Sequence, residues 1–284
     1  FYGDAKDKVG NDLYSATMNP NRGAWLEYET DASNVFYVRI DKNRKLPVTV
    51  LCRALGLSTN EDILNYFGED ERILATLEKD TTKNTEEGLL EVYRKLRPGE
   101  PPTVESATSQ INMLFFDPRR YDLSRFGRYK MNKKLSLARR IMGYVAAENI
   151  VAPLTGEIIV EAKGKITREL AEKADAAGVD TVILSIEGKK VKVITNGCVD
   201  AQGFFSFDVK ECGINERCSF DEIKKILDTT SDVEEQKEML RRNHDQLIGR
   251  TVTVKDILSS INYLNGLGHG IGTTDDIDHL GNRR

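Results

Sequence analysis

The sequence predicts an α+β protein that is mainly helical, with one β hairpin near its start and a small β-rich module inserted later. Apolar residues recur at helical spacing from Val48 to Phe115 and again from Phe220 to Leu264. Aromatic and β-branched runs precede the first helical region, and strand patterns separated by glycine fill residues 157–195. This order of patterns favours a helical domain interrupted by a separate β-rich module.

Length and composition exclude several classes of protein. The chain has 284 residues, with 41 Lys and Arg against 45 Asp and Glu, a net charge of −4, and 39% hydrophobic residues. These values are typical of a soluble globular protein of about two domains, and they exclude collagen-like, wholly disordered and uniformly basic chains. Apolar runs are only a few residues long, so no membrane-spanning helix is expected.

A β hairpin is the first predicted element. Aromatic and β-branched residues in Ala24–Glu29 and Val35–Asp41 favour strands, and turn-forming residues lie between them. After Pro47 the apolar spacing becomes helical, and Gly56 offers a C-terminal stop.

Further helices are expected between this hairpin and residue 116. Ser58 and Glu61 form a capping-box pattern that starts the first of them, and Gly68 ends it. The next three follow from helical apolar spacing and cover Glu71–Glu78, Thr85–Leu96 and Val104–Phe115.

The pattern changes at about Val151. Strands are predicted at Glu157–Glu161, Thr181–Glu187 and Lys190–Thr195, with one helix at Arg168–Ala177. This stretch therefore reads as a small β-rich module.

Helical spacing returns in the last third of the chain. Helices are predicted at Phe220–Leu227, Val233–Leu247 and Val254–Leu264, and Thr253 is the expected N-cap of the last. Gly266–Gly272 has glycine at every second position but lacks the spacing of a phosphate-binding loop, so a flexible loop is expected.

No self-contained catalytic or metal site is evident. The residues considered for zinc are Cys198, Cys212, Cys218 and His244. They lack the close cysteine pairs of structural zinc sites, so free and mostly buried thiols in a reducing cytoplasm are favoured. The acidic run Asp275–Asp278 could bind a hard cation, but no further ligand set lies nearby, and no nucleophile elbow occurs.

Basic residues concentrate between Arg119 and Arg140. This segment has nine Lys and Arg against the single acid Asp122, with Phe126 and Tyr129 among them. It suits a groove that follows a nucleic-acid backbone, but a solvated face or a surface for an acidic protein explains it equally well.

Trp25 is the only tryptophan in the chain. A lone tryptophan on a strand belongs to the core more often than to a binding surface. If its ring is exposed, it can stack on an unpaired base, which is worth about 1–3 kcal/mol.

Irregular motifs follow one another in a fixed order along the chain. They are Asn21–Glu27, Val38–Asp41 with Arg44–Pro47, Arg97–Thr103, Arg120–Leu123, Gly127–Lys130 and Asp275–Arg284. Together they resemble the lobe of the bacterial DNA-directed RNA polymerase beta subunit, over Tyr14 to about Leu135 and Thr251–Arg284.

The resemblance implies a fragment of a nucleotidyltransferase that lines the DNA cleft and contacts downstream DNA and the non-template strand. The DNA-binding residues that it implies, together with the adjacent basic cluster, are Trp25, Asp41, Lys42, Arg44, Asp278 and Arg283. In the family, the tryptophan that matches Trp25 stacks on a non-template base. Asp41 and Lys42 match residues near that strand, and Asp278 and Arg283 match residues of a pocket for a flipped guanine. Lys42 stands where many relatives have arginine, which keeps the charge but loses the planar guanidinium.

The resemblance also implies partners. These are the non-template strand and downstream duplex DNA, the beta prime, alpha and omega subunits, and a sigma factor, with no membrane and a location in the cytoplasm at the nucleoid. No cofactor is expected in this chain, because another subunit holds the catalytic magnesium. The fragment is therefore not expected to be catalytic alone.

Residues 1–140 and 250–284 are predicted to form the lobe domain, and residues 141–249 a lineage-specific β-rich insertion with flanking helices. An alternative function is a protein-interaction module whose insertion recruits a transcription factor. The first interpretation requires the two ends of the chain to meet and to present Trp25 on an exposed edge.

Overall fold

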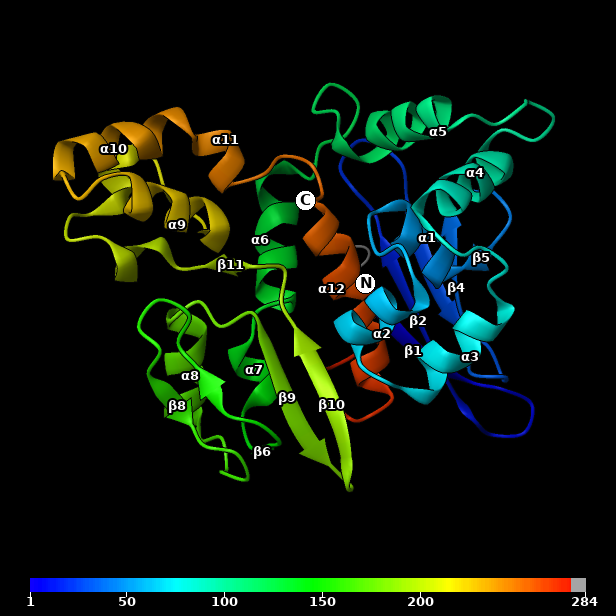
Figure 1. The fold of residues 1–284 in the computed structure, drawn as a ribbon, viewed down its shortest axis with the longest axis horizontal. Coiled ribbons are helices and arrows are strands. Elements are labelled where there is room, and N and C mark those ends of the chain that lie inside the picture. Colours follow the sequence, from blue (N-terminus) through cyan, green and yellow to red (C-terminus); the bar gives the residue numbers. More distant parts are fainter. Residues whose placement is uncertain (277–284) are drawn as a thin grey trace. The chain divides into compact units, whose positions relative to one another are not determined.

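The computed structural model describes residues 1–276, which form two compact units (Figure 1). Unit 1 contains residues 1–122 and the described residues from 261 onward, and unit 2 contains Leu123–Ser260. Both units combine helices and small sheets, which confirms the predicted α+β class. Within residues 1–276, every helix is too short or too polar to cross a bilayer.

Unit 1 is built on a five-stranded antiparallel sheet in the order β1-β2-β3-β4-β5. Its strands are β1 (Tyr2–Lys6), β2 (Asp12–Met18), β3 (Leu26–Thr30), β4 (Phe36–Ile40) and β5 (Leu46–Pro47). The pairing of β3 with β4 confirms the predicted hairpin. Strands β1 and β2 were not predicted from the sequence; β2 pairs with β3 of the hairpin, and β1 pairs with β2.

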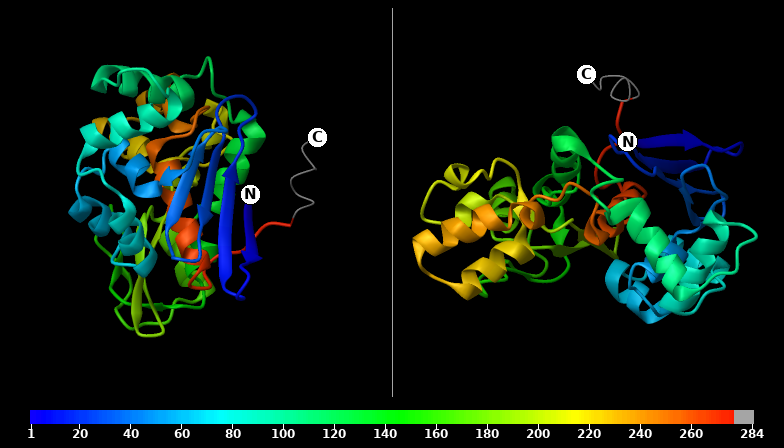
Figure 2. Two further views of the ribbon diagram at one scale, coloured as in Figure 1. Left: turned by 90° about the vertical axis from the view of Figure 1, so that its right-hand side faces the viewer. Right: turned by 90° about the horizontal axis from the view of Figure 1, so that it is seen from above.

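Helices α1 (Val48–Ala54) and α3 (Glu71–Lys79) pack on β4 and β5 of this sheet (Figure 2). Helix α4 (Thr85–Leu96) packs against α1, and α2 (Asn60–Phe67) against α1 and α3. Alternate residues of β3 and β4 are buried, so one side of each strand faces the core. The predicted helices of this region are thus confirmed.

The capping box of α2 lies one residue later than predicted. Thr59, not Ser58, is the N-cap, and its side chain accepts from the Asp62 amide while the Asp62 carboxylate accepts from the Thr59 amide. Aspartate therefore takes the place that the prediction gave to Glu61, because its carboxylate reaches back to the cap as a glutamate does.

The next helix changes its winding. It begins as α5 (Val104–Ile111) and continues as a π-helix, η1 (Asn112–Phe116), which contains the buried Phe115. The sequence predicted the extent of this helix but not the wider turn.

The glycine-rich segment 266–272 is not a free loop, and that prediction was wrong. Helix α12 (Val254–Leu267) includes Gly266, and the turn after it is fixed by several contacts within unit 1. Ile271 is buried, the Tyr263 hydroxyl bonds both the amide and the carbonyl of Thr273, and His269 Nε2 lies 2.6 Å from Asp70 Oδ2. Tertiary contacts therefore hold a segment that its glycine content alone would leave mobile.

The contact between His269 and Asp70 makes an acid-dependent contribution to stability. Burial raises the pKa of the Asp70 carboxyl, but hydrogen bonds from His269, the Arg72 amide and Asn265 outweigh burial and leave that pKa below 3.8. A group whose folded pKa is lowered stabilises the fold above its unfolded pKa, and this contribution is lost as the pH falls through the folded pKa.

We therefore expect Asp70→Asn to lower the free energy of unfolding by about 1.5–3 kcal/mol near pH 6. The difference from wild type should shrink as the pH approaches about 3. Asparagine still caps α3, so the substitution isolates the charged hydrogen bond. Urea unfolding at several pH values measures the difference, and a difference independent of pH would contradict the assignment.

Unit 2 contains the predicted β-rich module. Its strands β6 (Val145–Ala146), β9 (Thr181–Ile186) and β10 (Lys189–Ile194) form one sheet, while β7 (Ile150–Val151) pairs with β8 (Ile158–Val160). Helix α8 (Arg168–Ala176) lies between β8 and β9 in the chain. The predicted strands and helix of residues 157–195 are confirmed.

The remainder of unit 2 is helical. Its elements are α6 (Ser124–Lys134), α7 (Ala138–Ile141), α9 (Phe220–Thr229), α10 (Val233–Arg242), α11 (His244–Leu247) and the first part of α12. Two 3₁₀ turns, η2 (Ala201–Phe204) and η3 (Val209–Cys212), and the short pair β11 (Cys198–Val199) and β12 (Cys218–Ser219) complete a small core with α9–α11. The single helix predicted over Val233–Leu247 is broken at Asn243, whose backbone leaves the helical conformation.

Candidate nucleic-acid interface

Trp25 lies at the surface of unit 1, immediately before β3. Its side chain is 44% exposed, so the core interpretation of this residue is wrong. Two hydrogen bonds to Asp41 hold the backbone of Trp25. The Asp41 carboxylate accepts from the Trp25 amide at 2.8 Å, and the Asp41 amide donates to the Trp25 carbonyl at 2.8 Å. Asp41 has φ of 54°, a conformation that aspartate tolerates better than most residues.

A second segment supports the residues before Trp25. Arg22 and Asp122 exchange backbone hydrogen bonds of 3.1 and 2.8 Å. The Tyr121 ring packs so closely on Gly23 that a Cβ there would lie 2.6 Å from a ring carbon. Tyr121 in turn meets Phe115 edge to face, with ring centroids 6.4 Å apart. The indole is therefore mounted on a fixed loop.

Gly23→Ala is expected to disturb this mounting. Gly23 has φ of +125°, and the added methyl meets the Tyr121 ring, so we expect a loss of about 1–3 kcal/mol in unfolding free energy. Because Trp25 is the only tryptophan, its fluorescence emission and acrylamide quenching report the loop directly.

Gly10→Ala is the matched control for this substitution. Gly10 also has positive φ, but no atom lies within 4 Å of its would-be Cβ, so it carries the backbone cost without the contact. Equal effects of the two substitutions would contradict a role for the Tyr121 contact.

The other predicted binding residues divide into two groups. Lys42 and Arg44 are exposed in the turn that follows β4, next to Asp41. Asp278 and Arg283 lie outside the described residues. The described part of the C-terminal segment reaches β1, where Tyr2 and Asp275 exchange hydrogen bonds of 2.8 and 2.9 Å. The structure thus brings Trp25 and Asp41 together, with Lys42 and Arg44 in the adjoining turn.

Tyr121 and Asp122 belong to the motif Arg120–Leu123, but the sequence gave them no role in supporting Trp25. They are nearly a hundred residues from Trp25, and no local pattern links the two segments. The only local signal was Gly23 beside the tryptophan, since a glycine can mark close approach of another chain segment.

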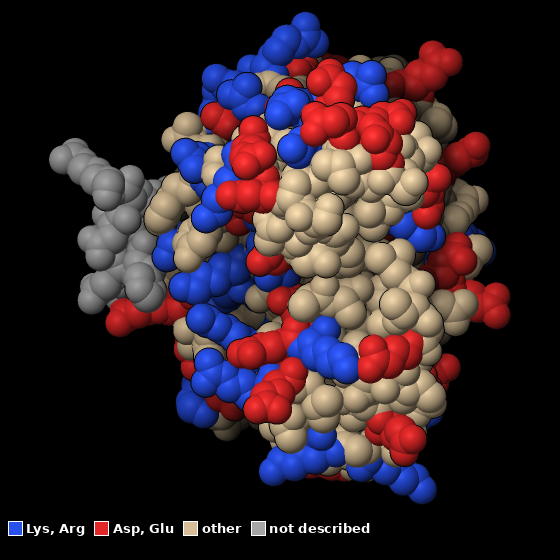
Figure 3. Space-filling model, turned by 90° about the vertical axis from the view of Figure 1, so that its left-hand side faces the viewer, with Lys and Arg blue, Asp and Glu red and all other residues tan. Residues whose placement is uncertain are grey.

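The basic segment 119–140 is less uniform than its sequence indicated. Arg128 and Arg140 are each only 3% exposed, and Arg119 pairs with Asp117 at 3.1 Å. Figure 3 shows one face of the molecule, where Lys and Arg gather near one edge, interspersed with Asp and Glu and beside a broad uncharged area. Arg128 and Arg140 therefore add nothing to the exposed charge of this segment, and the choice among a nucleic-acid groove, a solvated face and a surface for an acidic protein stays open.

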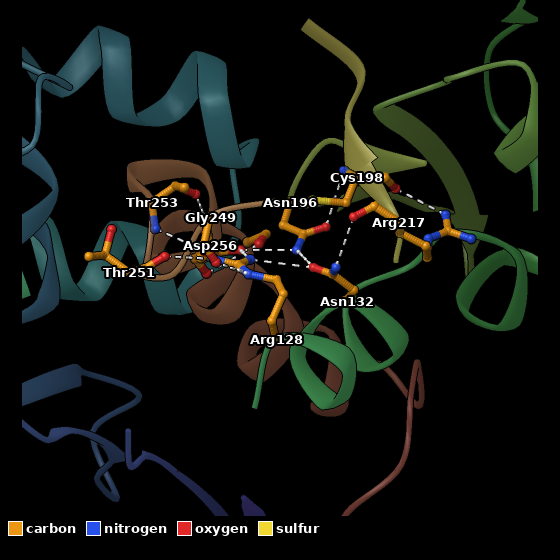
Figure 4. Close-up of polar contacts among 10 residues, drawn as sticks. Arg128, Asn132, Asn196, Cys198, Arg217, Gly249, Thr251, Thr253 and Asp256 are labelled. Atoms are coloured by element: carbon orange, nitrogen blue, oxygen red, sulfur yellow. Dashed lines mark hydrogen bonds and ion pairs between the residues drawn. The ribbon is translucent and has the colours of Figure 1, made fainter. Parts of the chain in front are cut away.

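Arg128 instead belongs to a buried polar network in unit 2 (Figure 4). Its guanidinium lies 3.0 Å from the Asp256 carboxylate and donates to the carbonyls of Gly249 and Thr251. Asn196 donates to both Asn132 and Asp256 at 3.0 Å. Thr253 and Asp256 also form a capping box, which confirms Thr253 at the start of α12. The network joins α6, α12 and the segment between β10 and β11.

The cysteines have the character of buried structural thiols. Burial raises the pKa of Cys198 and of Cys218 to about 12, so neither is a thiolate at neutral pH. Across residues 1–276, no three His, Cys, Asp or Glu side chains are grouped closely enough to hold a metal ion. The arrangement around Trp25 can stack and bind, and the described residues there supply no nucleophile with an activating base.

Comparison with known proteins gives consistent matches. The sequence model of the family "RNA polymerase Rpb2, domain 2" matches residues 2–142 and 198–284. The unmatched residues 143–197 lie within the predicted insertion 141–249, whose boundaries stay a prediction.

Similar relatives include three proteins called DNA-directed RNA polymerase subunit beta. That of Acetivibrio thermocellus is 57% identical over 286 residues, that of Alkaliphilus metalliredigens 55% over 285, and that of Clostridioides difficile 52% over 285. Each alignment covers all of this chain and 23% of the relative. The chain therefore spans about a quarter of the length of these relatives.

Proposed function

Since the chain belongs to the RNA polymerase Rpb2 domain 2 family and is part of a bacterial DNA-directed RNA polymerase beta subunit, we propose that it lines the DNA cleft and holds the non-template strand. The family resemblance that its motifs indicated is confirmed. The role of the lobe and its contacts with DNA are the proposal.

The observation that carries this proposal is the half-exposed indole of Trp25 on a rigid loop. An aromatic ring in contact with water loses apolar hydration when a base stacks on it, and stacking tolerates any base. Because Asp41 and Gly23 already fix the loop, little conformational entropy is lost when the strand binds.

Cationic residues beside the indole supply the second element of the proposal. Lys42 and Arg44 are exposed, and they are placed to neutralise phosphates of the strand whose base stacks on Trp25. Asp278 and Arg283 complete the proposed interface as a guanine pocket, in which the carboxylate accepts from the Watson–Crick edge of the base.

The proposed partners follow from the family. They are the non-template strand, the downstream duplex, the beta prime, alpha and omega subunits and a sigma factor, at the nucleoid. The chain contributes binding rather than chemistry, and we propose that it holds no cofactor, with the catalytic magnesium bound by another subunit.

The lifetime of open promoter complexes formed by the complete polymerase tests this function. If the indole holds the non-template strand, removing it should shorten that lifetime while leaving nucleotide addition intact. A lifetime that does not respond to Trp25 would refute the proposal.

A second candidate function is favoured by an observation in unit 2. Val151 and Ile158 are cross-strand neighbours of β7 and β8, and both are exposed, as is Leu154 in the turn between them. Exposed apolar side chains that cluster in this way are typical of protein contacts. The hairpin would then recruit a transcription factor. Loss of factor binding, but not of open-complex lifetime, on Ile158→Glu would separate this function from the first.

A further inference from the structure

We infer that one face of α6 in unit 2 is a second nucleic-acid contact surface, separate from the Trp25 loop. This α6 face consists of Arg125, Phe126, Tyr129, Lys130 and Lys133. The inference rests on the proposed function to the extent that the subunit works on DNA. It concerns residues outside the predicted binding set, in a segment whose composition left a nucleic-acid groove and two other surfaces equally possible.

The five side chains share one side of the helix. Their spacing of one, four, five and eight residues from Arg125 follows the helical repeat, so they form a single stripe along about two turns. All five are exposed, with Phe126 at 57% and Tyr129 at 47%. Neighbouring aromatic side chains that are open to water form the kind of contiguous apolar surface that marks contact sites.

The stripe is also strongly cationic. Helix α6 contains no acidic residue, and among residues 1–276 none of Arg125, Lys130 and Lys133 has an acidic partner. Unpaired cations on one helix face create a local positive potential even though the whole chain is acidic. Such a surface attracts a polyanion.

A lysine ammonium already lies over each exposed ring. The Lys130 ammonium lies 5.3 Å from the centroid of the Phe126 ring, and the Lys133 ammonium lies 5.9 Å from that of Tyr129. At exposed positions such contacts are weak, about 0.5–1 kcal/mol, so a stacking base can displace the lysine. The displaced ammonium is then free to neutralise the phosphate of that nucleotide.

The adjoining side of α6 explains why the stripe is presented rigidly. Arg128 and Asn132 lie on that side and enter the buried network with Asp256 and Asn196 (Figure 4). These contacts fix the rotation of the helix about its axis. The exposed rings therefore keep their orientation before any ligand binds, which lowers the entropy cost of binding.

The composition of the α6 face favours nucleic acid over an acidic protein. Two of its three cations are lysines, a residue depleted in protein–protein interfaces, whereas aromatic rings among lysines are typical of surfaces for single strands. An acidic protein segment is the competing occupant, and the experiment separates the two.

A photo-crosslinking experiment on the complete polymerase tests the inference. Tyr129, Trp25 and Val233 are each replaced by benzoylphenylalanine in separate enzymes, which are then irradiated in transcription complexes on end-labelled DNA with labelled RNA. Val233 is a matched control because it is an exposed apolar residue on another helix of unit 2. We expect label transfer at positions 129 and 25 and none at 233.

The other outcomes are also decisive. Transfer at position 25 alone overturns the inference and leaves the proposed function standing, whereas transfer at 129 alone supports the inference and contradicts the function proposed for Trp25. A protein adduct at 129 overturns the inference in favour of a protein partner. If label transfer at position 233 equals that at position 129, the crosslinking at 129 is non-specific and the inference is overturned.

A charge substitution gives an independent readout. Lys130→Gln with Lys133→Gln should reduce the salt dependence of polymerase–DNA binding, the slope of log K against log salt, by about two, one for each lost phosphate contact. Lys210→Gln with Lys224→Gln removes the same charge at exposed positions elsewhere in unit 2 and should leave the slope unchanged. Equal slopes for the two double variants would overturn the inference.

Discussion

Trp25→Ala in the complete polymerase is expected to shorten the lifetime of open promoter complexes by about 5- to 150-fold. This range corresponds to the roughly 1–3 kcal/mol that stacking of a base on an aromatic side chain contributes. The rate of phosphodiester formation should stay unchanged, because the described residues around Trp25 supply binding groups only. Challenge of preformed complexes with a competitor measures the lifetime, and single-nucleotide addition measures the chemistry.

Trp25→Phe is the control for this prediction. It keeps a ring that can stack, and the backbone contacts with Asp41 do not depend on the side chain at position 25. The phenylalanine variant should therefore retain most of the lifetime that alanine loses. An alanine variant with wild-type lifetime and pausing would remove the basis of the proposed function.

The second large effect is expected from Asp256→Ala in unit 2. The substitution leaves the buried Arg128 guanidinium without its counter-charge, and such a loss costs about 3–5 kcal/mol. It also removes the acceptor for the Thr253 amide at the start of α12. Urea unfolding, followed by a far-ultraviolet signal, measures the free energy.

A double variant distinguishes the charge pair from simple loss of packing. Arg128→Met with Asp256→Leu removes both charges and fills much of their volume, so it should be more stable than Asp256→Ala alone. If the double variant is as unstable as the single one, the hydrogen bonds to Gly249, Thr251 and Asn196 rather than the ion pair dominate the network.

Local patterns predicted most of the helices and the central hairpin. The β3–β4 pair, α1 and α8 each combine a regular apolar period with a turn or stop residue, and both signals act over a few neighbouring residues. Strands β1 and β2 were not predicted, although Tyr14, Ala16 and Met18 alternate along β2. They form because an existing sheet edge offers hydrogen-bond partners, which a linear pattern does not reveal.

Part of the candidate site could be predicted from the sequence, and part depended on contacts between distant segments. Trp25 and Asp41 were found because they fall in long motifs that resemble a known family, while the exposure of the indole depends on how the chain packs around it. Tyr121 could not be connected to Gly23 from sequence, because their contact joins segments that are about a hundred residues apart.

The sequence by itself determined the family of this protein, the position of most helices, and the presence of one tryptophan and a dense run of basic residues. Only the tertiary structure decided which of those residues meet solvent. Arg128 and Lys130 are two residues apart on α6, yet one is buried against Asp256 and the other is exposed. Residues two apart on a helix point to different sides, and only the packing of the rest of the unit decides which side is covered.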